Sequence, residues 1–210
     1  MEKSFQILNV EALKNAPLYN TPFPYIVVDN LLRPEVMARV VDAFPMIGKR
    51  GSFPLNDVMC RGEFATLMEE LQCDEFRALI GERFGMDLQN HPPFITLRGY
   101  TTHRDGHIHT DSASKLITVL LYLNPGWQDA GGRLRLLYNE KELTPYVAEI
   151  PPEAGRCVLF KVTPNCWHGH EPFVGVRRSI QLNYVQSDGV KELQRKRHRW
   201  SALLKRVFVK

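Results

Sequence analysis

Short apolar runs separated by turn residues dominate the sequence from residue 94 onwards. Runs of this length suit β-strands, and Pro, Gly, Asn and Asp gather between them. About eight such strands after a helical half predict an antiparallel jelly roll of two facing sheets, with helices supporting one face. The predicted fold class is therefore α+β but mainly β. The predicted strands cover residues 94–101, 107–110, 116–124, 133–138, 147–150, 156–160, 166–168 and 177–186.

The first half of the chain has the spacing of amphipathic helices. Apolar residues recur three or four positions apart, Pro34 suits the first turn of a helix, and Gly85 is of a type that often ends one. Residues 46–62 lack periodicity and contain Pro, Gly and Asn, so we expect a loop there, a candidate cover for a functional site. The helical groups are Met37, Val40, Val41 and Phe44; Phe64, Leu67, Met68 and Leu71; and Phe76, Leu79 and Ile80.

Length and composition limit the class of protein. The chain has 210 residues, enough for one well-buried domain and short for two. We predict a single domain over 1–210, with helical support over about 1–93, a jelly-roll core over about 94–186 and a C-terminal helix over about 189–210. The apolar runs are too short to span a bilayer, and the N-terminus lacks a secretory pattern. Four cysteines without C-x-x-C spacing indicate reduced thiols and a cytoplasmic location.

Basic residues gather near the C-terminus. Residues 189–210 hold eight Lys or Arg and one Glu, so they carry +7 against a chain total of +4, which leaves about −3 for the rest. Apolar residues in this segment recur at helical spacing, which predicts an amphipathic helix with the basic residues on its solvated face. Contact with nucleic acid or an anionic surface is the alternative. We expect the structural role and no nucleic-acid partner. The apolar residues are Leu193, Trp200, Leu203, Leu204 and Val207.

A candidate metal site is formed by the segment His109-Thr110-Asp111 and the later His168. Residues two apart on a strand point to the same face, so His109 and Asp111 would meet at one point. A second imidazole from a distant strand, His168, would complete a 2-His-1-carboxylate set. That set leaves positions open on a metal and is typical of non-haem Fe(II) oxygenases. His107 and His170 share the alternation of these residues and are rival ligands.

The motifs around this triad follow a specific order. They are HTD (109–111), LLYLN (120–124), Trp127, GGRLRL (131–136), PPEAGRCVLF (151–160) and HGHEPFVGVRRSI (168–180). Through them the chain resembles the 2-oxoglutarate- and Fe(II)-dependent dioxygenases, in the branch of the prolyl 4-hydroxylases and hypoxia-sensing prolyl hydroxylases. The resemblance covers roughly 94–186, and 22–34 less specifically. It implies a double-stranded β-helix, a metal site at His109, Asp111 and His168, and Fe(II), 2-oxoglutarate and O2, with ascorbate as a candidate reductant.

The resemblance also implies a basic residue for the distal carboxylate of 2-oxoglutarate, and two adjacent arginines qualify. Alternation places Arg177 on a polar face with Ser179, Gln181 and Asn183, and places Arg178 on the opposite, largely apolar face. A guanidinium can hold a carboxylate through two parallel hydrogen bonds. Because a polar face suits the interior of the barrel, Arg177 is the favoured anchor and Arg178 is the rival.

Three further residues are candidates for contact with 2-oxoglutarate. Tyr122 would donate its hydroxyl to the distal carboxylate by resemblance, and a core tyrosine is the alternative. Thr118 lies on the same strand with the same alternation. Tyr100 precedes His109 by nine residues, and relatives often have a tyrosine near that position which faces the co-substrate or the substrate.

Two departures from the family pattern bear on the prime substrate. Asn183 stands where several relatives have an aromatic residue, which makes the pocket roomier and more polar. Only residues 112–115 separate Asp111 from the next strand, so the long substrate-gripping loop of the hypoxia-sensing enzymes is absent. These features leave both a polar small molecule and a prolyl or peptidyl group open. The oligomeric state is also open, with a homodimer as one option.

The predicted activity is hydroxylation of an unactivated C–H bond by a 2-oxoglutarate-dependent dioxygenase. Halogenating relatives lack the carboxylate ligand, whereas Asp111 is present. Demethylases of nucleic acids have a second arginine six residues after the anchor, where this chain has Asn183. A jelly-roll module that binds metal or carbohydrate, or senses a ligand, without turnover is the alternative. The pair Arg177 and Tyr122 distinguishes the enzyme from the binding module, because such a module needs no carboxylate anchor inside the barrel.

Overall fold

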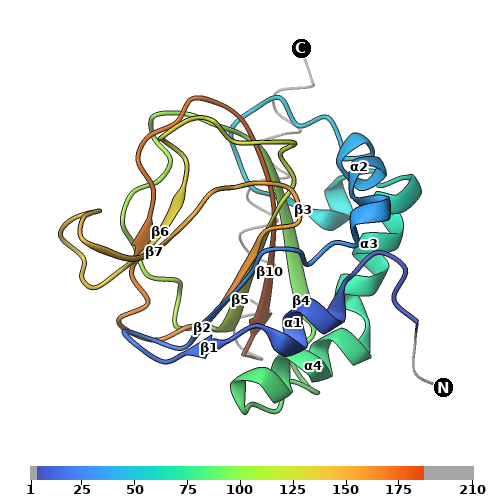
Figure 1. Ribbon diagram of the computed structural model, residues 1–210, viewed down its shortest axis with the longest axis horizontal. Helices are drawn as coiled ribbons and strands as arrows, with labels where there is room; N and C mark the ends of the chain where they lie inside the picture. Colours follow the sequence, from blue (N-terminus) through green and yellow to red (C-terminus); the bar gives the residue numbers. More distant parts are fainter. Residues whose placement is uncertain (1–3, 187–210) are drawn as a thin grey trace.

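The computed structural model describes residues 4–186 and places two antiparallel sheets face to face (Figure 1). The larger one, the major sheet, has seven strands, and the smaller one, the minor sheet, has three. The major sheet has the order β1 (Leu18–Tyr19), β2 (Tyr25–Val28), β8 (Cys157–Lys161), β5 (Lys115–Tyr122), β10 (Gly175–Val185), β4 (Pro93–Thr101) and β3 (Phe53–Pro54). The minor sheet has the order β7 (Tyr146–Ile150), β6 (Leu134–Leu137) and β9 (His168–Gly169).

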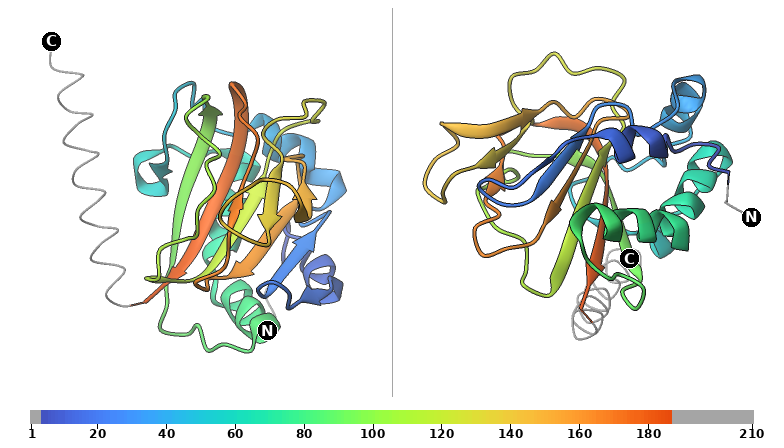
Figure 2. Two further views of the ribbon diagram at one scale, coloured as in Figure 1. Left: turned by 90° about the vertical axis from the view of Figure 1, so that its left-hand side faces the viewer. Right: turned by 60° about the horizontal axis from the view of Figure 1, so that its bottom comes forward.

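The helices cover the face of the major sheet that is turned away from the minor sheet (Figures 1 and 2). They are α1 (Val10–Asn15), α2 (Pro34–Asp42), α3 (Gly62–Gln72) and α4 (Asp74–Phe84). Pro34 occupies the first turn of α2, and Gly85 ends α4 in the left-handed conformation with φ 61°. The predicted helical support is therefore confirmed. Phe44 falls just after α2 but remains buried against Phe64, at 5.3 Å between ring centroids.

Alternation along the central strands separates an apolar face from a polar one. On β10, Ile180, Leu182 and Tyr184 are buried in the cluster shared with the helices. Ser179 and Gln181 instead line a cavity between the two sheets. On β5, the register places Tyr122 beside Ser179 and Leu120 beside Gln181 on this same face. The interior of the jelly roll therefore receives polar side chains from β10, as the sequence pattern predicts, next to an apolar cluster that includes Leu134, Val158 and Phe160.

The fold class is confirmed, although two segments differ from the prediction. Residues 107–110 do not form a strand; a single bridge joins His109 to His168. The expected loop over 46–62 contains β3 and a short 3-10 helix, η1 (Leu55–Asp57). β3 extends the major sheet beside β4, which local periodicity could not indicate because β3 has only two residues. The predicted basic helix over 189–210 lies outside the described residues. Within 4–186, no helix combines the length and apolar character that crossing a membrane requires.

A buried carboxylate on α3 attaches the N-terminal segment to the helical layer. Glu70 is almost fully buried and accepts hydrogen bonds from the backbone N–H groups of Gln6 at 2.6 Å, Ile7 at 3.1 Å and Leu8 at 2.8 Å. Buried N–H groups without a partner destabilise a fold. Glu70 therefore supplies acceptors for N–H groups beside the single bridge that joins Leu8 to Leu32, and Ile7 and Leu8 can remain in the core.

We expect Glu70→Ala to lower the free energy of unfolding by about 3 kcal/mol, because the substitution leaves the buried N–H groups of Ile7 and Leu8, and the partly buried one of Gln6, without this acceptor. The measurement is chemical denaturation together with the melting temperature. Glu69→Ala is the matched control, since Glu69 is the exposed neighbour on the same helix. Equal stability of the two variants would mean that Glu70 does not hold the N-terminal segment.

Candidate metal and 2-oxoglutarate site

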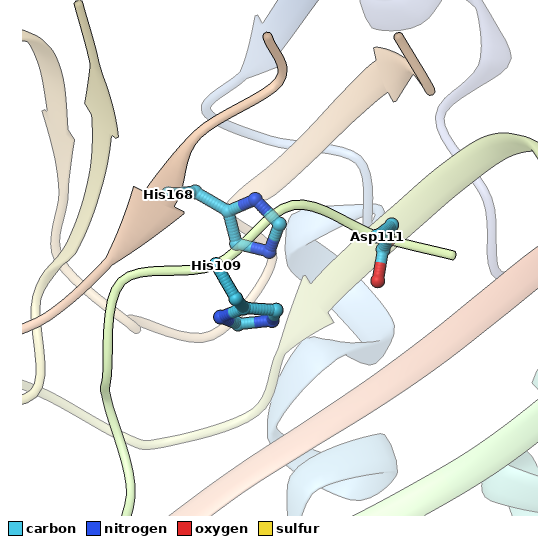
Figure 3. Close-up of side chains that lie close together, drawn as sticks. All are labelled: His109, Asp111 and His168. Atoms are coloured by element: carbon cyan, nitrogen blue, oxygen red, sulfur yellow. The ribbon is translucent and has the colours of Figure 1, made fainter. Parts of the chain in front are cut away.

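His109, Asp111 and His168 converge at one end of the space between the sheets (Figure 3). One potential ligand atom from each lies within 4.8 Å of the others, and this is the single such cluster among residues 4–186. Two backbone hydrogen bonds of 3.0 Å join His109 to His168. This bridge, rather than a regular strand, brings the two imidazoles together. Their ring centroids lie 4.3 Å apart.

Backbone carbonyls determine which nitrogen of each imidazole is available. His109 Nδ1 lies 2.8 Å from the carbonyl oxygen of His107, and His168 Nδ1 lies 2.8 Å from that of Cys166. A carbonyl oxygen can only accept, so each Nδ1 carries the proton and each Nε2 keeps its lone pair. Burial, and then the neighbouring His109, lower the pKa of His168 to about 4. Neutral imidazoles with a free Nε2 are the form that binds a metal.

Asp111 is held by two side chains that approach different oxygens. Lys115 Nζ donates to Oδ1 at 2.6 Å, and Thr118 Oγ1 donates to Oδ2 at 2.5 Å. Burial alone raises the pKa of Asp111, but Lys115, His168 and the hydrogen bonds outweigh burial, so the net pKa is below its ordinary value. The carboxylate is therefore ionised and oriented. Because each oxygen has two lone pairs, a further lone pair remains for a metal. The donor set fits Fe(II), which such sites bind through two imidazoles and one carboxylate.

A cavity of about 110 Å³ adjoins the two histidines and holds Arg177 and Tyr122. Arg177 is only 6 % exposed. Its Nε donates to the Gly132 carbonyl at 2.8 Å, and its Nη2 lies 3.5 Å from the Tyr122 hydroxyl. Gly132 has φ 73°, and a Cβ at this position would come within 2.7 Å of the Trp127 ring. Only glycine therefore allows the loop to present this carbonyl to Arg177.

Arg178 is directed away from this cavity. Its Nη1 donates to the carbonyl of Val41 at 3.2 Å, and its guanidinium lies 5.6 Å from the centroid of the Phe44 ring. The pairing of β10 with β4 shifts its register between Val176 and Ser179. Despite this irregularity, Arg177 lines the same cavity as Ser179 and Gln181. The two arginines therefore lie on opposite faces of the sheet, as alternation predicts.

The remaining candidate residues occupy different surroundings. The Thr118 hydroxyl contacts Asp111 and also lies 3.1 Å from Asn183 Oδ1. Tyr100 lies on β4 but does not line the cavity. His107 is exposed, whereas His170 lines the cavity, and burial lowers the pKa of His170 to about 4. The roles of Thr118 and Tyr100 toward 2-oxoglutarate stay predictions.

Sequence reasoning missed two residues of the site. Lys115 contacts Asp111 across a short turn, where no periodicity marks it. Arg98 lines the cavity from β4, and its alternation with Tyr100 was the available signal. Lys115 and Arg98 are both cations, and the spacing rules that identify metal ligands do not predict where cations lie around the site.

Comparison with known proteins agrees with this geometry. Residues 94–185 match the model of the 2OG-Fe(II) oxygenase superfamily. The structure resembles a prolyl-4-hydroxylase from Pseudomonas putida, with a TM-score of 0.53 and 18% identity, over 85% of this chain and 91% of that chain. It also resembles a viral collagen prolyl hydroxylase from Paramecium Bursaria Chlorella virus-1, with a TM-score of 0.53 and 13% identity, over 77% of this chain and 96% of that chain. No curated protein matches.

Residues 94–185 therefore match the 2OG-Fe(II) oxygenase superfamily, and the chain shares its fold with prolyl 4-hydroxylases. The cluster of His109, Asp111 and His168 lies within the matched part of the chain and is a donor set suited to iron.

Proposed function

We propose that this protein hydroxylates an unactivated C–H bond, with His109, Asp111 and His168 as the ligands of Fe(II). The observation that carries this proposal is the convergence of one ring nitrogen from each of two histidines and one carboxylate oxygen within 4.8 Å. These ligands leave coordination positions open for a co-substrate and for oxygen. When bound, Fe(II) with 2-oxoglutarate and O2 supplies the oxidising power, and succinate and CO2 are the by-products.

The residues of the chain would position the co-substrate and the metal ligands, and they would not supply the oxidant. Arg177 and Tyr122 would hold the distal carboxylate of 2-oxoglutarate, because both line the cavity beside the two histidines. A buried guanidinium with its Nε already fixed by Gly132 is preorganised for such a contact. Thr118 and Lys115 would keep Asp111 directed at the metal, as outer contacts do in metal sites generally.

The proposed prime substrate is a polar small molecule or a prolyl or peptidyl group. The similar structures are those of prolyl hydroxylases, one of them a collagen prolyl hydroxylase. The polar side chains of Ser179 and Gln181 line the cavity and support a polar substrate. A binding or sensing module without turnover is the alternative, and the buried pair Arg177 and Tyr122 favours the enzyme, because it supplies a carboxylate anchor.

We expect succinate to form when the protein is incubated with Fe(II), 2-oxoglutarate and O2, and the rate to rise with a suitable prime substrate. A chelator should stop the reaction, and Fe(II) should restore it. Anaerobic titration should also show the visible charge-transfer band of 2-oxoglutarate chelated to Fe(II). Absence of both this band and succinate would favour the non-catalytic module.

A further inference from the structure

A second arginine, Arg98, lines the cavity of the proposed site from β4. It pairs in register with Ser179 on β10, and β4 and β10 run side by side in the major sheet (Figure 2). Because paired residues share a face, Arg98 lies on the same side as Ser179 and Gln181. The proposed roles in metal and 2-oxoglutarate binding do not use Arg98.

The guanidinium of Arg98 lacks a close partner. Its Nε is enclosed and makes no hydrogen bond within the described residues. Its Nη1 comes only within 3.8 Å of Asp105 Oδ1, which is too long for a hydrogen bond. The other oxygen of Asp105 accepts from Arg50 at 2.9 Å and from the backbone N–H of Thr102 at 2.9 Å. Asp105 is therefore shared between Arg50 and Arg98, and the guanidinium N–H groups of Arg98 keep their hydrogen-bonding capacity.

The net charge of the site would remain positive after Fe(II) and 2-oxoglutarate have bound. The residues that line the cavity include two arginines and three histidines but no carboxylate. Lys115 offsets Asp111, Arg50 offsets Asp105, and the two carboxylates of 2-oxoglutarate would offset the double charge of the metal. The guanidinium charges of Arg177 and Arg98 then remain. A desolvated, positively charged site favours an anionic ligand.

Arg98 also lies where the cavity meets a second opening. A cleft of about 410 Å³ lies beside the cavity and shares Gly106 and His170 with it. Asp105, the neighbour of Arg98, lines this cleft. The side chain of Arg98 lines the cavity and is 39 % exposed, so a ligand that enters the cavity can reach it. The cleft has room for a small molecule beside a filled cavity.

We propose that Arg98 binds a carboxylate group of the prime substrate, which is therefore a small carboxylic acid. The inference rests on the proposed function and narrows it, because a capped prolyl peptide has no carboxylate to offer. Arg98 would hold the substrate through charge-assisted hydrogen bonds from guanidinium N–H groups that have no acceptor within the described residues. Arg177 is left to bind 2-oxoglutarate.

The test uses the full chain loaded with Fe(II) and 2-oxoglutarate without oxygen. The probes are free L-amino acids and small 2-hydroxy acids, each beside its carboxamide, and one capped prolyl peptide. Binding is measured by calorimetry and by the change in the charge-transfer band, and turnover is measured afterwards as succinate. The variants are Arg98→Gln and Arg98→Lys. The matched control is Arg104→Gln, which removes one charge from an exposed position on the neighbouring loop.

We expect at least one acid to bind wild type about tenfold to a hundredfold more tightly than its amide. Arg98→Gln should erase this preference, Arg98→Lys should keep part of it, and Arg104→Gln should keep all of it. Affinity for 2-oxoglutarate should be similar in all four proteins. The assignment would be overturned if wild type bound acids and amides equally, or bound no acid at all. It would also be overturned if Arg98→Gln turned over the capped peptide at the wild-type rate, or if that variant bound 2-oxoglutarate more weakly. A wild type without the charge-transfer band would instead contradict the proposed function itself.

Discussion

Turnover of 2-oxoglutarate should fall by at least roughly a hundredfold when Asp111 or His168 is replaced by alanine, while the fold survives. Changes to outer contacts of a metal site already cost about tenfold to a hundredfold in affinity or activity, so loss of a ligand should cost more. Neither residue belongs to the two hydrophobic clusters. The core on both sides of the major sheet therefore remains intact.

Succinate formation, Fe(II) affinity and circular dichroism should be measured on the same preparations. His107→Ala is the matched control, because His107 is exposed and contributes only its backbone carbonyl to His109. This variant should retain Fe(II) binding and turnover. Wild-type-like activity of Asp111→Ala, with the metal still bound, would remove Asp111 from the site.

Arg177→Ala should raise the apparent KM for 2-oxoglutarate by about tenfold to a hundredfold, whereas Arg178→Ala should leave it nearly unchanged. Arg177 lies inside the cavity with Tyr122, and Arg178 contacts Val41 and Phe44 on the helical side. The two variants remove the same charge from adjacent positions. Each is therefore the control for the other.

Titration of 2-oxoglutarate in the succinate assay measures the change in KM. Thermal denaturation measures a second effect, on stability. Arg178→Ala should lower the free energy of unfolding by about 1 kcal/mol, through loss of its hydrogen bond and its contact with an aromatic ring. A large rise in KM for Arg178→Ala with a normal Arg177→Ala would mean that the irregularity at 176–179 exchanges the two roles.

Local pattern predicted α2, α3, α4 and most of the strands correctly, because each depends on which residues share a face, but it did not indicate α1. Val40 and Val41 face the core at helical spacing, and Ile180 and Leu182 do so at strand spacing. Each burial preference acts within one element, so a single sequence can reveal it. The prediction failed at 107–110, where His109 meets His168 through a lone bridge. Alternation in the sequence cannot indicate whether a partner strand continues on either side.

The sequence by itself determined the jelly roll, the candidate triad and the face on which Arg177 lies, because periodicity and a specific order of motifs are local properties. Only the tertiary structure decided the surroundings of those residues. It placed Lys115 and Thr118 on Asp111, directed Arg178 toward α2, and left the Nε of Arg98 without an acceptor beside the cavity. These contacts join segments whose distances in space depend on how the sheets close. The charge and hydrogen bonding of a site depend on those distances, and so the site's preference for ligands emerges only in the folded chain.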